Sequence, residues 1–291
     1  MRNKLTLGVF LFILLLVGIQ TVWKPFRTIP LAGAEYVNSV DSLTLDHWVQ
    51  LDFQNSLEDS LRKSFGFRPH AVRFYNQLLY SCFSEMNPQV VAKGDTLFEV
   101  GYLPSIKGKD YLGEEKILAK IDSLDAFNRM LEAQGTHLVI VLAPNKWRSF
   151  HVVDSISNLT NYASFKQKLS QMKITFIDAL QWFEEKNGMD DFPLHSKQGT
   201  HWSIYGGFQV ANALRDTIAH LGLEIPRINV DSMEVGGPKN TDKDLRDLLN
   251  VMMPPSHEDL AYPHLSFNGI EKPTALVIGD SYYWTFYYLG I

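Results

Sequence analysis

A serine and a histidine occur where they could act as a nucleophile and its base. Ser281 ends a short apolar run, ALVIGDS at 275–281, and His201 lies upstream in GTHWS at 199–203. A buried strand that breaks at a glycine can deliver a serine to the edge of an α/β sheet, as in enzymes that form acyl intermediates. A simple turn and a packed histidine are the alternatives for each segment alone. Together they favour acyl transfer, with Ser281 as nucleophile and His201 as base.

The elements that would position these residues alternate between helix and strand. Apolar periodicity predicts helices at 117–131, 162–172, 180–186 and 204–218, and apolar runs predict strands at 137–142, 174–177 and 274–278. Alternating units of this kind indicate an α/β fold with a parallel sheet flanked by helices. Ligands then bind beyond the carboxyl ends of the strands.

The region upstream of this pattern is mostly helical. Mixed three- and four-residue spacing of apolar residues predicts helices at 45–61 and 72–83, and Lys93-Gly94-Asp95 predicts the turn of a hairpin over 90–98. We therefore predict three parts. They are an N-terminal membrane anchor (1–27), a helical lead-in region with a short hairpin (28–112), and the main α/β domain (113–291).

The N-terminal segment is long and apolar enough to span a bilayer. Residues 5–23 carry no charge, and Arg2 and Lys4 precede them. The short basic tail favours a cytoplasmic N-terminus with the rest of the chain exported. A signal peptide cleaved near Ala32-Gly33-Ala34 is the alternative, but the length of the apolar run favours an uncleaved anchor. We predict a single-pass protein of the inner (cytoplasmic) membrane, with its catalytic domain in the periplasm or outside the cell.

Composition excludes several classes of function. The net charge of −5 gives no global basic surface, which argues against nucleic acid as the main partner. Cys82 is the only cysteine, so a zinc site would depend on histidines and carboxylates. The spacing of His195 and His201 matches no metal motif. We predict neither a metal nor a cofactor.

Several motifs taken together resemble one family. They are Thr200-His201-Trp202-Ser203-x-Tyr205-Gly206, the segment VIGDS at 277–281, SFGFR at 64–68, GDTLFE at 94–99 and APNK at 143–146. This set resembles the alginate O-acetyltransferase family (AlgJ/AlgX-like, with the DHHW proteins), which has a permuted SGNH-hydrolase-like domain. The resemblance covers most of the chain that follows the anchor.

The resemblance implies an exported serine acyltransferase that acetylates hydroxyls of a polysaccharide. Ser281 would carry the acetyl group, His201 would move the proton, and backbone N–H groups near Ser281, around Gly279 and Asp280, would bind the oxyanion. The donor would be a small acetyl ester or a membrane-bound O-acyltransferase partner. Candidate substrate contacts are Trp202, Lys146 and Tyr282; the aromatic residues among 282–288 could stack on sugar rings or fill a core.

This chain departs from the family pattern in two places. The family's acid usually stands two residues before the histidine, where this chain has Gly199, so the acid must come from elsewhere. Asp190 and Asp191 are nearest in sequence, and we take Asp191 as the candidate; Asp280 is expected to be structural. The segment DKDLRD at 242–247 could line the site or bind a cation, but the start of a solvated helix is favoured.

The second departure is at the C-terminus. Family members usually continue well beyond the nucleophile, so the resemblance implies an incomplete chain. An acetylesterase of the same fold, and an inactive polysaccharide-binding scaffold of a secretion complex, remain alternatives; the glycine at the expected acid position favours the scaffold.

Overall fold

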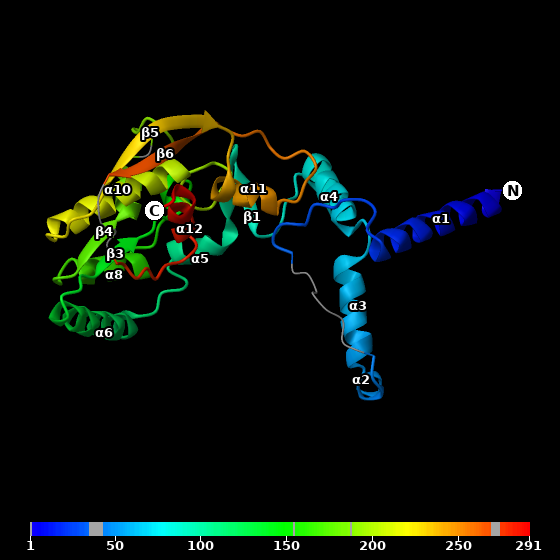
Figure 1. Ribbon diagram of the computed structural model, residues 1–291, viewed down its shortest axis with the longest axis horizontal. Coiled ribbons are helices and arrows are strands. Elements are labelled where there is room, and N and C mark those ends of the chain that lie inside the picture. The colour runs from blue at the N-terminus through cyan, green and yellow to red at the C-terminus, as the bar shows by residue number, and fades with distance from the viewer. Residues whose placement is uncertain (1, 35–42, 154, 187, 269–273) are drawn as a thin grey trace. The chain divides into compact units, whose positions relative to one another are not determined.

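The protein forms two compact units (Figure 1). The computed structural model describes residues 2–34, 43–153, 155–186, 188–268 and 274–291. One unit contains Met1–Asn87 with Asp247–Pro254, and the other contains Pro88–Arg246 with Pro255–Ile291. The second unit holds both the predicted nucleophile and the predicted base.

The first unit is helical, as the apolar periodicity predicts. Its helices are α1 (Arg2–Val22), α2 (Leu45–Val49), α3 (Asp52–Ser64), α4 (Arg68–Leu78) and the π-helical turn η1 (Leu79–Phe83). By length and composition, α1 can cross a membrane over Lys4–Val22. The separate segment Asp247–Pro254 is held to α4 by the amide of Gln77, whose Oε1 accepts the N–H groups of Met252 and Met253 at 3.0 and 2.7 Å.

The second unit begins with the hairpin that the sequence predicts. β1 (Val90–Lys93) pairs antiparallel with β2 (Thr96–Glu99), and Gly94 takes a positive φ of 62° in the turn between them. The parallel pair follows, with β3 (Val139–Leu142) aligned to β4 (Thr175–Asp178). The helical elements of this part are η2 (Val100–Tyr102), α5 (Leu103–Ile106), α6 (Glu114–Ala133), α7 (Lys146–Ser149), α8 (Asn161–Leu169), α9 (Ala179–Lys186) and α10 (Ile204–His220).

The C-terminal part of this unit differs from the prediction. The apolar run 274–278 forms no strand, and Leu276, Val277 and Ile278 are 87%, 57% and 87% exposed. The prediction of a strand there was wrong, because a short apolar run does not by itself supply a neighbouring backbone to pair with.

An antiparallel pair that the sequence did not reveal occupies this region instead. β5 (Arg227–Gly236) pairs with β6 (Leu260–Asn268), and the long connection between them carries η3 (Asn240–Lys243) and α11 (Asp244–Leu248). The last helix is α12 (Tyr283–Leu289). A hairpin with a connection of this length has no turn signature.

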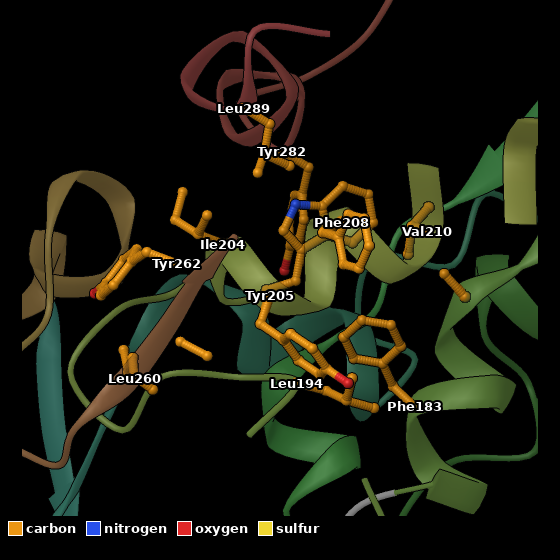
Figure 2. Packing of buried hydrophobic residues seen from close by; sticks show 13 residues of the cluster. Phe183, Leu194, Ile204, Tyr205, Phe208, Val210, Leu260, Tyr262, Tyr282 and Leu289 are labelled. Atoms are coloured by element: carbon orange, nitrogen blue, oxygen red, sulfur yellow. The ribbon is translucent and has the colours of Figure 1, made fainter. Parts of the chain in front are cut away.

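The main core joins α10 to the elements around it (Figure 2). Phe183, Leu194, Phe208 and Tyr282 belong to one buried cluster. A Cβ on Gly207 would lie 2.3 Å from the Thr285 side chain, so glycine is required for α10 and α12 to approach this closely. This contact places the turn before α12 next to the segment before α10.

Candidate active site

The structure brings the predicted nucleophile and base together. His201 lies just before α10, whose N-cap is Ser203, and its ring is buried. Ser281 is exposed in the turn that precedes α12. The hydroxyl of Ser281 lies 2.8 Å from Nε2 of His201, in position to donate its proton to that nitrogen.

A carboxylate completes the arrangement. Oδ2 of Asp244, the first residue of α11, lies 2.7 Å from Nδ1 of His201. This contact fixes the proton on Nδ1 and leaves Nε2 free to accept from Ser281. The second oxygen, Oδ1, accepts the N–H groups of Thr200 at 2.8 Å and Leu245 at 2.6 Å. The carboxylate therefore has a fixed orientation.

The acid position is a correction to the sequence-based expectation. Asp191 lies in an exposed loop near Tyr205, whose pKa is raised by burial first and then by Asp190 and Asp191. Asp244, from the segment that we expected to be a solvated helix start, makes the contact that we assigned to Asp191. The sequence signal for Asp244 was only its place in an acidic run.

Gly199 explains why the acid comes from α11. A Cβ at this position would lie 2.4 Å from the carbonyl oxygen of Thr241 and 3.0 Å from backbone atoms of Asp242. No acidic side chain fits there without moving that backbone. The backbone of Thr241 and Asp242 occupies the space beside Gly199, and Asp244 follows two residues later. The same packing therefore leaves no room for an acid at position 199 and brings Asp244 to His201.

The backbone that carries His201 is fixed by side chains from other elements. We call residues 199–201 the base segment. Nζ of Lys146 donates to the carbonyl of Gly199 at 2.6 Å, the hydroxyl of Tyr282 lies 3.3 Å from the carbonyl of Thr200, and Nδ1 of His195 lies 3.2 Å from the carbonyl of His201. All three carbonyls therefore have a partner outside the segment.

The three candidate substrate contacts are buried. Lys146, Trp202 and Tyr282 are 4%, 2% and 5% exposed. Nζ of Lys146 also donates to the carbonyl of Leu97 at 2.7 Å, and the hydroxyl of Tyr282 donates to the carbonyl of Pro144 at 2.7 Å. This burial favours packing for Trp202 and positioning of the base segment for Lys146 and Tyr282 over the substrate contacts that the sequence predicts.

Asp280 and Gly279 lie in the turn before the nucleophile. Oδ1 of Asp280 accepts the N–H of Tyr282 at 3.0 Å, which is the structural role expected of it. Gly279 is exposed. The turn therefore presents Ser281 to solvent while Tyr282 anchors it to the protein interior.

Three buried titratable residues lie close to the base segment: Lys146, Asp242 and His195. Burial lowers the pKa of Lys146 to about 7, although the nearby carboxylates of Asp244 and Glu258 favour its charged form. Burial raises the pKa of Asp242 to about 8 and lowers that of His195 to about 3. At neutral pH His195 is therefore uncharged and Asp242 is largely protonated. In the parts of the chain that the structure describes, no group of three or more His, Cys, Asp or Glu residues could hold a metal ion.

Comparisons with known proteins agree with the motif-based resemblance. A family model described as "SGNH hydrolase-like domain, acetyltransferase AlgX" matches residues 107–263, which is more than half of the chain. This range includes His201 and Asp244 and ends before Ser281. No curated protein matches the chain.

Two solved structures are similar at low identity. The O-acetyltransferase domain of Pseudomonas putida AlgJ is 17% identical with a TM-score of 0.43, and the match covers 62% of this chain and 66% of that chain. Bacillus cereus PatB1 is 16% identical with a TM-score of 0.39, and the match covers 60% and 57% of the two chains. Both matches span less than two thirds of the solved chain. By the extent of the family match, the chain belongs to the family of SGNH hydrolase-like domains of the acetyltransferase AlgX type, with the α/β fold that the motifs implied.

Proposed function

We propose that this protein is a membrane-anchored, extracytoplasmic O-acetyltransferase that acetylates hydroxyl groups of a polysaccharide through an acyl-enzyme on Ser281. The observation that carries the proposal is the continuous chain of contacts from Ser281 through His201 to Asp244, at 2.8 and 2.7 Å. Membership of the AlgX-type acetyltransferase family supports acetyl as the group transferred. The apolar helix α1 supports membrane attachment.

The first half-reaction loads the enzyme. Nε2 of His201 takes the proton of Ser281 as Oγ attacks the carbonyl carbon of the acetyl donor. The N–H of Ser281 is the oxyanion donor that we propose, since the N–H of Tyr282 is bound by Asp280. The tetrahedral intermediate collapses, His201 gives its proton to the departing donor group, and the acetyl ester of Ser281 remains. Asp244 stabilises the imidazolium.

The second half-reaction transfers the acetyl group. His201 removes the proton of a polysaccharide hydroxyl, whose oxygen attacks the acetyl carbonyl, and then returns that proton to Oγ of Ser281. The products are an acetylated polysaccharide and free enzyme. No cofactor is needed in this scheme, and the donor is a small acetyl ester or a membrane-bound O-acyltransferase partner.

An acetylesterase differs only in the acceptor, because water would attack the same acyl-enzyme. The scaffold alternative rested on the absence of an acid at position 199, and the position of Asp244 removes that reason. The exposed setting of Ser281 leaves room for a large acceptor and supports transfer to a glycan.

A chromogenic acetyl ester tests the proposal with the full chain in detergent or nanodiscs. We expect chromophore release by the wild type and its loss in Ser281→Ala and His201→Ala. Ser123→Ala and His220→Ala, which change residues on α6 and α10 away from the site, serve as matched controls. Release that persists in both site variants contradicts the mechanism. Adding an acceptor polysaccharide then separates transfer, which yields acetylated glycan, from hydrolysis, which yields only acetate.

A further inference from the structure

The helices that follow the anchor expose apolar side chains along their length. Neither α2 nor α3 has a buried residue. On α3, Leu57 and Leu61 are spaced one turn apart with Phe53 and are 37% and 49% exposed. Trp48 of α2 is 52% exposed and lies beside Phe53, with ring centroids 6.3 Å apart. We call Trp48, Phe53, Leu57 and Leu61 the apolar face.

The opposite side of α3 is polar and includes charged residues. Asn55, Glu58 and Arg62 lie at positions displaced from the apolar residues, and Arg62 forms an ion pair with Asp59 at 2.8 Å. An exposed apolar stripe backed by charged residues is typical of a helix that lies in the plane of a membrane surface.

A close joint ties the end of α3 to the last turns of α1. The N–H of Gly66 donates to Oγ1 of Thr21 at 2.7 Å. A Cβ on Gly66 would lie 2.6 Å from the carbonyl oxygen of Val17 and 2.7 Å from Cβ of Gln20. Glycine at this position therefore allows the chain after α3 to contact the backbone of the anchor.

The chain that leaves the anchor strengthens this joint. The amide of Gln20, which is 3% exposed, donates to the carbonyl of Phe26 at 2.6 Å and accepts its N–H at 3.0 Å. Phe26 packs against Phe67, with ring centroids 5.8 Å apart. The side chains of Gln20 and Thr21 thus have hydrogen-bond partners within the joint, and the C-terminal end of α3 lies at the level where the apolar span ends. In Figure 1, α3 leads away from this joint across the direction of α1.

From this placement we propose that α2 and α3 lie in the membrane interface on the exported side, with the apolar face of Trp48, Phe53, Leu57 and Leu61 in contact with lipid. The inference rests on the proposed anchoring of the chain by α1. Gly66, two residues after α3, contacts Val17 and Thr21 in the last turns of the anchor, so the apolar face begins next to the end of the membrane span. This proximity indicates lipid as the occupant.

The charge of α3 indicates that apolar burial, not attraction to anionic headgroups, holds it there. Its acids Asp52, Glu58 and Asp59 outnumber its bases Arg62 and Lys63. A helix without a basic excess gains nothing from anionic lipid. Zwitterionic lipid alone is therefore sufficient for the contact.

Spin-label accessibility in nanodiscs of phosphatidylcholine tests the proposal on the full chain. Cys82 is exposed and is the only cysteine, so Cys82→Ser provides a background without thiols. Single labels are placed through Leu57→Cys and Leu61→Cys on the apolar face, and through Glu58→Cys and Arg62→Cys on the charged side as matched controls. We expect the ratio of accessibility to oxygen over a water-soluble nickel chelate to be several-fold higher at 57 and 61 than at 58 and 62.

Three results overturn the inference. Equal access of the nickel chelate at all four positions places α3 in water, and exclusion of both reagents at 57 and 61 indicates a protein partner. A ratio that rises only after addition of anionic lipid contradicts contact by apolar burial. A label introduced by Leu14→Cys reports on α1 separately: lipid exposure at 14 with water exposure at 57 and 61 removes this inference alone, whereas water exposure at 14 removes the anchor itself.

Discussion

The segments that carry the base and the nucleophile are held in opposite ways. In the base segment, 199–201, every carbonyl is within hydrogen-bond distance of a side chain from another element, and His201 is 8% exposed. The nucleophile segment, 274–281, forms no strand, and Ile278 is 87% exposed. The geometry of the site is therefore set mainly by the contacts that hold the base segment, whereas the nucleophile segment is open to solvent.

This contrast predicts where substitutions are costly. Removing the donor of a buried carbonyl costs about 1–3 kcal/mol of folding free energy. The loss of any one contact to the base segment is therefore expected to be costly. Changes in the nucleophile segment, apart from Ser281 itself, remove fewer buried contacts.

The largest effect is expected for Asp244→Asn. An amide at this position no longer fixes the proton on Nδ1 of His201, so kcat/KM for an acetyl ester should fall on the order of 10³- to 10⁴-fold. The matched control is Asp191→Asn, which changes the acid suggested by the sequence and should leave the rate unchanged. Steady-state kinetics of both variants decide the assignment; a large loss in Asp191→Asn with little change in Asp244→Asn reverses it.

A smaller but substantial loss is expected for Lys146→Met. Methionine preserves the buried length and removes the donor to the carbonyls of Gly199 and Leu97, so the base segment can shift. A displacement on the scale of 1 Å costs about 10²-fold in rate, which is the loss we expect in kcat.

Lys166→Met serves as the control for lysine removal, because Lys166 pairs with Asp178 at the end of β4 and not with the base segment. Melting curves establish that the Lys146 variant is folded before its rate is compared. A folded Lys146→Met enzyme with wild-type kcat shows that the carbonyl contacts do not position the base.

Tyr282→Phe should have a still smaller effect. It removes the hydroxyl that donates to the carbonyl of Pro144, worth about 1 kcal/mol, and that lies 3.3 Å from the carbonyl of Thr200. It keeps the ring that packs on His201 at 4.9 Å between centroids. The expected loss of kcat/KM is less than about tenfold. Tyr288→Phe, at a half-exposed position on α12, is the control. A loss as large as that of Lys146→Met would show that the hydroxyl of Tyr282 positions the base segment as strongly as the ammonium group of Lys146 does.

Asp242→Asn is expected to change the pH dependence of stability. The pKa of Asp242 is about 8 in the folded protein against an ordinary 3.8, so the folded state retains a proton that the unfolded state loses above pH 4. Stability from this group is present below pH 4 and falls as pH rises toward 8, by at most about 1.4 kcal/mol per pH unit.

Melting temperatures at pH 5 and pH 7 check this sign. Lys146 contributes little to the change in stability between these two pH values. Its pKa is about 7 in the folded protein and 10.5 ordinarily, so it is charged in both states over most of this range. The wild type should lose more stability than Asp242→Asn between the two pH values. Parallel curves for the two proteins contradict a protonated Asp242.

The sequence predicted several of the local elements and the pairing of Ser281 with His201, which lie 2.8 Å apart in the structure. The hairpin at β1 and β2, the parallel strands β3 and β4 and helix α10 are confirmed, because each has a periodic or continuous apolar pattern and a turn signal. Ser281 and His201 could be identified as candidates because each has a reactive side chain two residues after a glycine that interrupts regular structure.

The rest depends on contacts that sequence spacing does not encode. Asp244 reaches His201 only because the connection between β5 and β6 packs against Gly199, and no local pattern predicts that pairing. Lys146 and Tyr282 are predicted as substrate contacts, yet their polar atoms bond to buried carbonyls. The burial of a polar side chain is decided by tertiary packing.

The central claim is that Ser281 carries the acetyl group during turnover. Acid quenching of the full-length wild type during reaction with an acetyl ester, followed by peptide mass spectrometry, tests it most directly. The account predicts an acetyl group on Ser281 in the wild type and none on that peptide in Ser281→Ala. Acetylation of a different residue, persisting in Ser281→Ala together with full activity, would contradict it.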